Sequence, residues 1–136
     1  MSGNEYQKLA MRTNDGKATE RLNDKLDMIQ FFKDAKAGRP TEKYDLGGIF
    51  DAALGLSGEI GEFNDLLKKW VFHEKPLDVD HAKKELGDIM WYVAMMCHSF
   101  GWELNDILQM NIDKLKARYP EGFDVDRANF RKDGDV

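Results

Sequence analysis

The sequence predicts an all-α protein of about four to five helices. Apolar residues recur at every third or fourth position in several segments, which is the period of an amphipathic helix. No stretch shows the strict alternation of apolar and polar residues that is typical of a β-strand. Helix-stopping residues separate the segments, as at Gly38-Arg39-Pro40 and at Gly101. The 136 residues suffice for one compact domain, so we expect a single domain over 1–136 with its core at about 46–122.

Two helical segments precede that core. Asn4 is placed to cap a short helix over 6–12, and Asn14-Asp15-Gly16 then predicts a turn. A second helix is predicted over 19–37, and we treat 16–44 as a helical extension. The apolar residues at helical spacing in this second helix are Leu22, Leu26, Ile29 and Phe32.

Two longer helices make up most of the predicted core. The first is expected over 48–70, and the second from a cap at Asp78 or Asp80 to Ser99 or Phe100. Each carries an apolar stripe that we expect to be buried. The stripe of the first helix contains Ile49, Ala52, Ala53, Leu56, Ile60, Phe63, Leu67 and Trp70, and that of the second Ala82, Leu86, Ile89, Met90, Val93, Cys97 and Phe100.

A fifth helix is predicted over 103–118, between Gly101 and the stop signals that follow it. Its expected inner face carries Leu104, Leu108 and Leu115, and the helix ends before Pro120 and Gly122. Residues 124–136 are mostly polar and charged, so we expect a loosely docked tail there.

Two carboxylate pairs carry the first chemical signal. Glu59 and Glu62 lie three residues apart on one predicted helix, and Glu85 and Asp88 on the next. Residues at this spacing lie on one side of a helix, about one turn apart. Four carboxylates that face each other repel, and a hard divalent cation such as Mg²⁺ or Mn²⁺ relieves the repulsion. A single pair of this kind indicates little. Only together with the glycines of the first carboxylate helix, and with the position of both pairs beside the apolar stripes, does a metal site become as well supported as a solvated or ion-paired acidic flank.

Three glycines on the first carboxylate helix favour the metal site. Gly55, Gly58 and Gly61 each cost about 1 kcal/mol relative to alanine in a helix interior. Such a series is explained by the close approach of another backbone or of a ligand.

Cationic and aromatic side chains near the carboxylates suggest a phosphate and a base. Asn111, Lys114 and Arg118 share one face of the fifth helix, where they either bind phosphates or lie at the edge of the core. Lys69 is a further candidate for phosphate binding, with a solvated helix end as the alternative. Trp70 and Tyr92 are candidates for base stacking, with core packing as the alternative. His81, one turn before Glu85, is either a hydrogen-bond partner of that carboxylate or a plain surface histidine. Apart from His81, the substrate-binding candidates are therefore Lys69, Trp70, Tyr92, Asn111, Lys114 and Arg118.

Charge and hydropathy exclude other classes. The net charge of −5 argues against a nucleic-acid partner. The longest apolar run, 89–100, is too short to cross a bilayer, and the first residues do not follow the pattern of a signal peptide. The single Cys97 is expected to be a reduced core thiol, so we expect a cytoplasmic protein.

Three motifs in order resemble the MazG-like nucleotide pyrophosphohydrolases of the all-α NTP pyrophosphatase superfamily. They are Gly55-Leu-Ser-Gly-Glu-Ile-Gly-Glu62, Lys84-Glu-Leu-Gly-Asp-Ile-Met-Trp-Tyr92 and Asn111-Ile-Asp-Lys-Leu-Lys-Ala-Arg-Tyr-Pro120. The resemblance implies a helical bundle that is completed by oligomerisation, as a homodimer or homotetramer whose sites draw on more than one subunit. Some relatives carry an additional Glu just before the E-x-x-E, and here that position is Gly58.

The resemblance also implies a reaction. Glu59, Glu62, Glu85 and Asp88 would ligate Mg²⁺, with Mn²⁺ as a possible substitute. A metal-activated water would then attack a nucleoside triphosphate between the α- and β-phosphates, giving a nucleoside monophosphate and pyrophosphate. Glu59 or Glu62 would accept the proton of that water, and the substrate-binding candidates of the fifth helix match the family's phosphate- and sugar-contacting helix. The base and sugar, and a role in house-cleaning of the nucleotide pool or in alarmone control, are not specified by these residues.

Two alternatives belong to other classes. A di-iron carboxylate bundle needs Glu-x-x-His motifs, and neither Glu59 nor Glu85 is followed by histidine at the third position. A non-catalytic module of the same fold would bind a nucleotide, or a partner through 16–44, and the four intact carboxylates argue against it.

Overall fold

The structure is a computed structural model that describes residues 2–26, 35–38, 44–131 and 134. The described residues form helices and no strands, which confirms the all-α prediction. The helices are α1 (Gly3–Ala10), α2 (Ala18–Leu26), α4 (Leu46–Phe72), α5 (Val79–Phe100), α6 (Leu104–Arg118) and α7 (Val125–Asn129), and a 3-10 turn, η1, spans Met11–Thr13. Within the described ranges, none of the helices combines the length and the apolar character needed to cross a bilayer.

The chain divides into two compact units, Met1–Lys43 and Tyr44–Val136. In the first unit, α1 starts three residues earlier than expected because Ser2, not Asn4, is its cap. The Ser2 hydroxyl accepts from the Glu5 amide, and the Glu5 carboxylate accepts from the Ser2 amide at 2.6 Å, so two amides at the helix start are satisfied. The predicted cap at Asn4 is therefore wrong. The second predicted helix is present as α2, while Ile29 and Phe32 lie outside the described residues.

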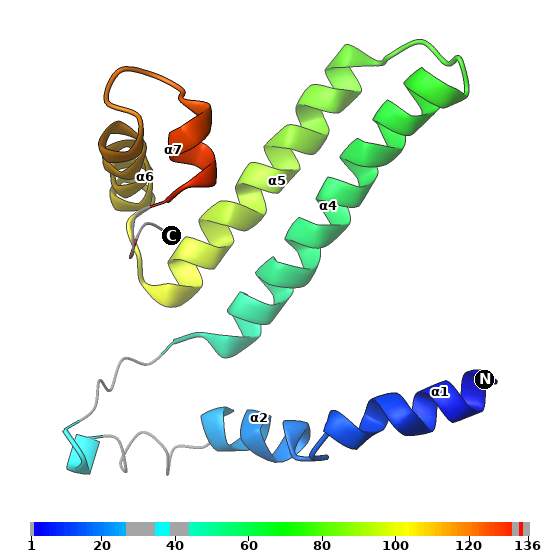
Figure 1. The fold of residues 1–136 in the computed structure, drawn as a ribbon, viewed down its shortest axis with the longest axis vertical. Coiled ribbons are helices and arrows are strands. Elements are labelled where there is room, and N and C mark those ends of the chain that lie inside the picture. Colours follow the sequence, from blue (N-terminus) through cyan, green and yellow to red (C-terminus); the bar gives the residue numbers. More distant parts are fainter. Residues whose placement is uncertain (1, 27–34, 39–43, 132–133, 135–136) are drawn as a thin grey trace. The chain divides into compact units, whose positions relative to one another are not determined.

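Two long helices dominate the second unit: α4 and α5 run antiparallel, side by side, and are joined by residues 73–78 (Figure 1). Asp45 caps α4 by accepting from the Gly48 amide at 3.0 Å. Asp78, one of the two predicted caps of α5, accepts from the His81 amide at 2.9 Å. Gly101 ends α5 in the left-handed conformation, with φ of 72°, as its sequence position predicts.

Small residues of α4 form the seam between the two helices. The Asp45 amide donates to the Ser99 carbonyl at 3.0 Å, and a Cβ at Gly48 would lie 2.3 Å from the Ser99 hydroxyl. Ala52 is fully buried, and a Cβ at Gly55 would lie 2.1 Å from the Tyr92 ring. Positions 48, 52 and 55 share one helix face. Glycine and alanine there allow α4 and α5 to approach closely.

The predicted apolar stripes are buried at Ala52 and Cys97, as expected, but several of their bulkier members stay exposed. Ile60 and Trp70 of the predicted α4 stripe are 44% and 48% exposed, and Leu86 and Met90 of the α5 stripe are 53% and 47% exposed. The prediction of burial is therefore wrong for these residues in the single chain. The physical reason is that the small face, and not the bulky one, gives the closest helix packing.

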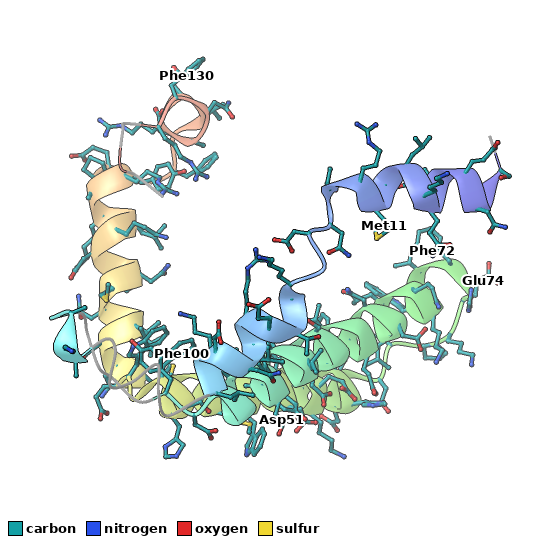
Figure 2. All side chains as sticks on the ribbon, turned by 90° about the horizontal axis from the view of Figure 1, so that it is seen from below. Met11, Asp51, Phe72, Glu74, Phe100 and Phe130 are labelled. Carbon is teal, nitrogen blue, oxygen red and sulfur yellow. The ribbon has the colours of Figure 1, made fainter. Side chains whose placement is uncertain are left out.

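The remaining helices follow the hairpin. α6 ends at Arg118, as predicted, and among the described elements it shares few contacts with α4 or α5. Its Leu108 and Leu115, expected on an inner face, are 52% and 39% exposed. Residues 124–136 contain α7, which the sequence analysis does not predict; Asp124 caps it by accepting from the Arg127 amide at 2.8 Å. Phe130 projects from the end of α7 (Figure 2).

Candidate metal centre

Three carboxylates from the two long helices meet in the seam. Glu59 of α4 and Glu85 and Asp88 of α5 each offer one oxygen, and these three oxygens lie within 4.8 Å of one another. Glu85 is buried, Glu59 is half-buried and Asp88 is exposed, so the group is closed on one side and reaches solvent on the other. The structure thus brings together three of the four predicted metal ligands.

The helix register explains this meeting. Glu59 follows Gly48, Ala52 and Gly55 at the next turn of the same face of α4. On α5, Asp88 and Glu85 continue the face that starts with Ser99 and Tyr92. Because small residues hold the backbones close in the first turns of α4, the carboxylate side chains further along can reach each other.

The electrostatics of the group favour a bound cation. Partial burial raises the pKa of Glu59, and the negative charges of Asp88, Glu62 and Glu85 raise it further. Glu62 is exposed and stands outside the group of three, although its charge acts on Glu59. A cation bound between these carboxylates would offset the repulsion that raises the pKa of Glu59.

The geometry fits a small, hard cation. Oxygen ligands on opposite sides of Mg²⁺ are about 4.2 Å apart, because each lies about 2.1 Å from the ion. The three carboxylate oxygens lie within 4.8 Å of one another, so a modest side-chain adjustment suits them to a single ion of this size. A set made only of carboxylate oxygens favours Mg²⁺ or Mn²⁺ over softer metals.

One hydrogen bond reaches this group from a histidine. His81 Nε2 lies 2.7 Å from Glu85 Oε1. Of the two roles considered for His81, the structure therefore supports that of hydrogen-bond partner and not that of a plain surface histidine. The imidazole nitrogen donates, since an ionised carboxylate only accepts.

The predicted cation Lys69 is paired in the structure. Lys68 lies 2.8 Å from Asp65, and Lys69 forms an ion pair with the other oxygen of the same carboxylate. These two lysines lower the pKa of Asp65 to about 2. Sequence reasoning overlooked Asp65, although its spacing of three and four residues from the lysines is a signal for such pairs.

The two aromatic candidates have different surroundings. Tyr92 packs on Gly55 and meets the Trp91 ring edge-on, with ring centroids 4.9 Å apart. Trp70 is 48% exposed and lies in the last turn of α4. Tyr92 is therefore part of the seam beside the carboxylates, while Trp70 offers an open ring face.

The predicted phosphate-binding face of α6, with Asn111, Lys114 and Arg118, lies on a different helix from the carboxylates of α4 and α5. Asn111 and Lys114 are exposed, and Arg118 is half-buried with its guanidinium 5.9 Å from the centre of the Tyr119 ring. In the described chain α6 shares few contacts with α4 and α5. The single chain therefore brings the carboxylates together but does not place the cationic face of α6 over them.

The fold and the site together define an all-α protein with a group of three carboxylates, suited to a metal ion, in a helical hairpin. The model of the MazG nucleotide pyrophosphohydrolase domain matches residues 51–123, more than half of the chain, and the chain belongs to this family. The matched range contains α5, α6 and most of α4, including all four predicted metal ligands. The resemblance inferred from the three motifs is thereby confirmed.

The chain is also similar to a curated phage protein. The chain is 34% identical over 80 residues to the "Gene 37 protein" of Mycobacterium phage L5, which corresponds to 55% of this chain and 69% of that protein. No solved structure shows a significant match to the chain.

Proposed function

We propose that this protein is a Mg²⁺-dependent nucleoside triphosphate pyrophosphohydrolase. It would hydrolyse an NTP or dNTP to the corresponding monophosphate and pyrophosphate. The observation that carries the proposal is the meeting of Glu59, Glu85 and Asp88 within 4.8 Å, in a chain whose family is named for this class of reaction.

The acidic group has two tasks in this reaction. Glu59, Glu62, Glu85 and Asp88 hold Mg²⁺, or Mn²⁺ in its place. When bound there, the ion supplies an acidified, oriented water and offsets charge on the phosphates. Glu59 accepts a proton from the attacking water, with Glu62 beside it, since a carboxylate positioned at the water is a suitable general base.

The substrate's other parts need cationic and aromatic side chains. Asn111, Lys114 and Arg118 bind the phosphates and sugar, with Lys69 exchanging its pairing with Asp65 for a phosphate oxygen. Trp70 and Tyr92 contact the base.

A second copy of the chain would bring the cationic face of α6 to the acidic group. The two surfaces are not joined within one chain, and the apolar stripes beside them are exposed. A homodimer or homotetramer would cover these stripes and complete the site.

The test is pyrophosphate release from a panel of NTPs and dNTPs, with Mg²⁺ or Mn²⁺ and with EDTA. We expect metal-dependent release that Glu62→Ala and Asp88→Ala abolish. Asp80→Asn is the matched control, because Asp80 is an exposed carboxylate at the start of α5 outside the acidic group. Unimpaired turnover in Glu62→Ala or Asp88→Ala would contradict the mechanism. Metal binding without turnover of any nucleotide would point instead to a non-catalytic module.

A further inference from the structure

His81 contacts the acidic group although it lies outside the E-x-x-E and E-x-x-D motifs. Its Nε2 donates to Glu85 Oε1 at 2.7 Å across one turn of α5. Because a carboxylate has two oxygens, accepting from His81 at Oε1 still allows Oε2 to ligate a metal. The hydrogen bond thus occupies one oxygen of a predicted ligand without replacing it.

Burial distinguishes this pair from an ordinary surface pair. The Glu85 side chain is 9% exposed and that of His81 is 49% exposed. Two residues away, Lys83 and Asp80 are 3.8 Å apart with side chains that are 74% and 89% exposed. Water screens the second pair strongly, whereas a hydrogen bond to a buried carboxylate is screened little and holds its acceptor in place.

The register of α5 places His81 in the same seam. Ser99, Tyr92, Asp88, Glu85 and His81 are separated by seven, four, three and four residues, which keeps them on one helix face. His81 therefore stands one turn beyond the last carboxylate of this face.

A long, flexible ligand benefits from a fixed partner. Glutamate has three rotatable side-chain bonds, and ordering them on metal binding costs free energy. Carboxylates that ligate metals are commonly hydrogen-bonded by outer residues, and loss of such a partner typically lowers metal affinity or activity.

We propose that His81 is a positioning residue, which holds the buried carboxylate of Glu85 in the conformation that binds the divalent cation. The inference rests on the proposed function, because it concerns the same metal site. His81 touches neither the nucleotide nor the reacting atoms.

The experiment compares three substitutions by titration with Mn²⁺, with free Mn²⁺ measured by electron paramagnetic resonance. His81→Gln keeps an amide nitrogen at nearly the position of Nε2, whereas His81→Asn has a shorter reach and His81→Ala has no donor. We expect His81→Ala and His81→Asn to weaken Mn²⁺ binding about 10- to 100-fold. His81→Gln should retain most of the affinity, and His98→Ala, at an exposed histidine of the same helix, should match the wild type.

Pyrophosphate release gives a second readout. At saturating Mn²⁺ the KM for the nucleotide should be unchanged in all the His81 variants, since only the metal site is affected. The inference is overturned if all three His81 variants bind Mn²⁺ as tightly as the wild type. It is also overturned if all three bind it equally weakly, because His81→Gln should then have kept the hydrogen bond. If instead the wild type neither binds Mn²⁺ nor releases pyrophosphate, it is the proposed function that fails.

Discussion

Glu59 is the residue at which stability and the proposed activity oppose each other. Its pKa is raised in the folded chain, so the unfolded chain releases this proton at lower pH than the folded one. The ionised Glu59 therefore destabilises the fold. This effect is absent at pH values below the pKa of Glu59 in the unfolded chain and fully present above its pKa in the folded chain. The metal-free protein therefore loses stability from this group as the pH rises from the ordinary pKa of a glutamate through the raised pKa of Glu59.

Because ionised Glu59 destabilises the metal-free fold, the substitution Glu59→Gln should stabilise it. In EDTA at pH 7.5 the variant should melt at a higher temperature than the wild type, because a neutral amide ends the repulsion with the neighbouring carboxylates. The gain should shrink at pH 4, where Glu59 is largely protonated. Pyrophosphate release should fall about 10²- to 10⁴-fold, as expected for the loss of a general base. Thermal unfolding at both pH values checks the first part, and a lower melting temperature at pH 7.5 would contradict it.

Glu74 has a backbone conformation that residues other than glycine rarely adopt. It has φ of 53°, and it follows α4 where the Lys75 amide donates to the Lys69 carbonyl at 3.2 Å (Figure 2). A glycine at this position of a helix end avoids the contact between Cβ and backbone that penalises other residues.

We therefore expect Glu74→Gly to stabilise the protein by about 0.5–1 kcal/mol, since the relief of strain exceeds the added flexibility of the unfolded chain. Urea denaturation measures the change. Glu74→Ala is the control, because it removes the carboxylate but keeps the Cβ, and it should bring no such gain. Equal stabilisation by both variants would mean that the charge, and not the backbone, is responsible.

At the scale of the helix, the glycines of α4 have unequal surroundings. A Cβ at Gly55 would overlap the Tyr92 ring, whereas a Cβ at Gly58 or Gly61 would meet nothing within 4 Å in the chain. The sequence explanation by close approach is confirmed for Gly55 alone.

This contrast predicts opposite effects of alanine. Gly55→Ala should destabilise by about 1–3 kcal/mol, because the seam has no room for a methyl group. Gly58→Ala and Gly61→Ala should each stabilise the helix of an isolated chain by up to about 1 kcal/mol. Chemical denaturation of the three variants, at a concentration where the protein is monomeric, makes the comparison. A neutral Gly55→Ala would show that Tyr92 does not hold α4 and α5 at their observed separation.

The helices also show which features a sequence can predict. The cap at Asp78, the stop at Gly101 and the end of α6 at Arg118 were predicted because each depends on a few neighbouring residues. The close approach at Gly55 was predicted from the glycine series, but the extent of the seam was not, because hydrophobicity indicates the bulky residues and only the partner helix decides that the small face is buried. The meeting of three carboxylates follows from that seam. The pairing of Lys69 with Asp65 depends on side-chain conformations that spacing permits without requiring.

At the scale of the molecule, the second unit buries very little apolar surface. Among the described residues, Ala52 and Cys97 are the apolar side chains that are nearly inaccessible to water. Many large apolar residues of the same unit are exposed. They include Leu54, Val71, Phe72, Leu86, Trp91, Met110 and Phe123, and Figure 2 shows Phe72 at the end of α4. Exposure of so many large apolar residues is typical of a chain that has an interface, since single domains normally enclose such residues.

The corresponding prediction concerns Leu54, which is 75% exposed on the α4 face that also carries Gly58 and Gly61. These small residues leave room for another helix, so we expect sedimentation equilibrium to give a homodimer or homotetramer. Leu54→Lys should shift the population toward the monomer and lower pyrophosphate release, because a charge in an apolar interface is destabilising. Lys83→Glu, at an exposed lysine of α5, should leave the assembly unchanged. A wild type that stays monomeric over the whole concentration range would contradict the proposed completion of the site by a second copy.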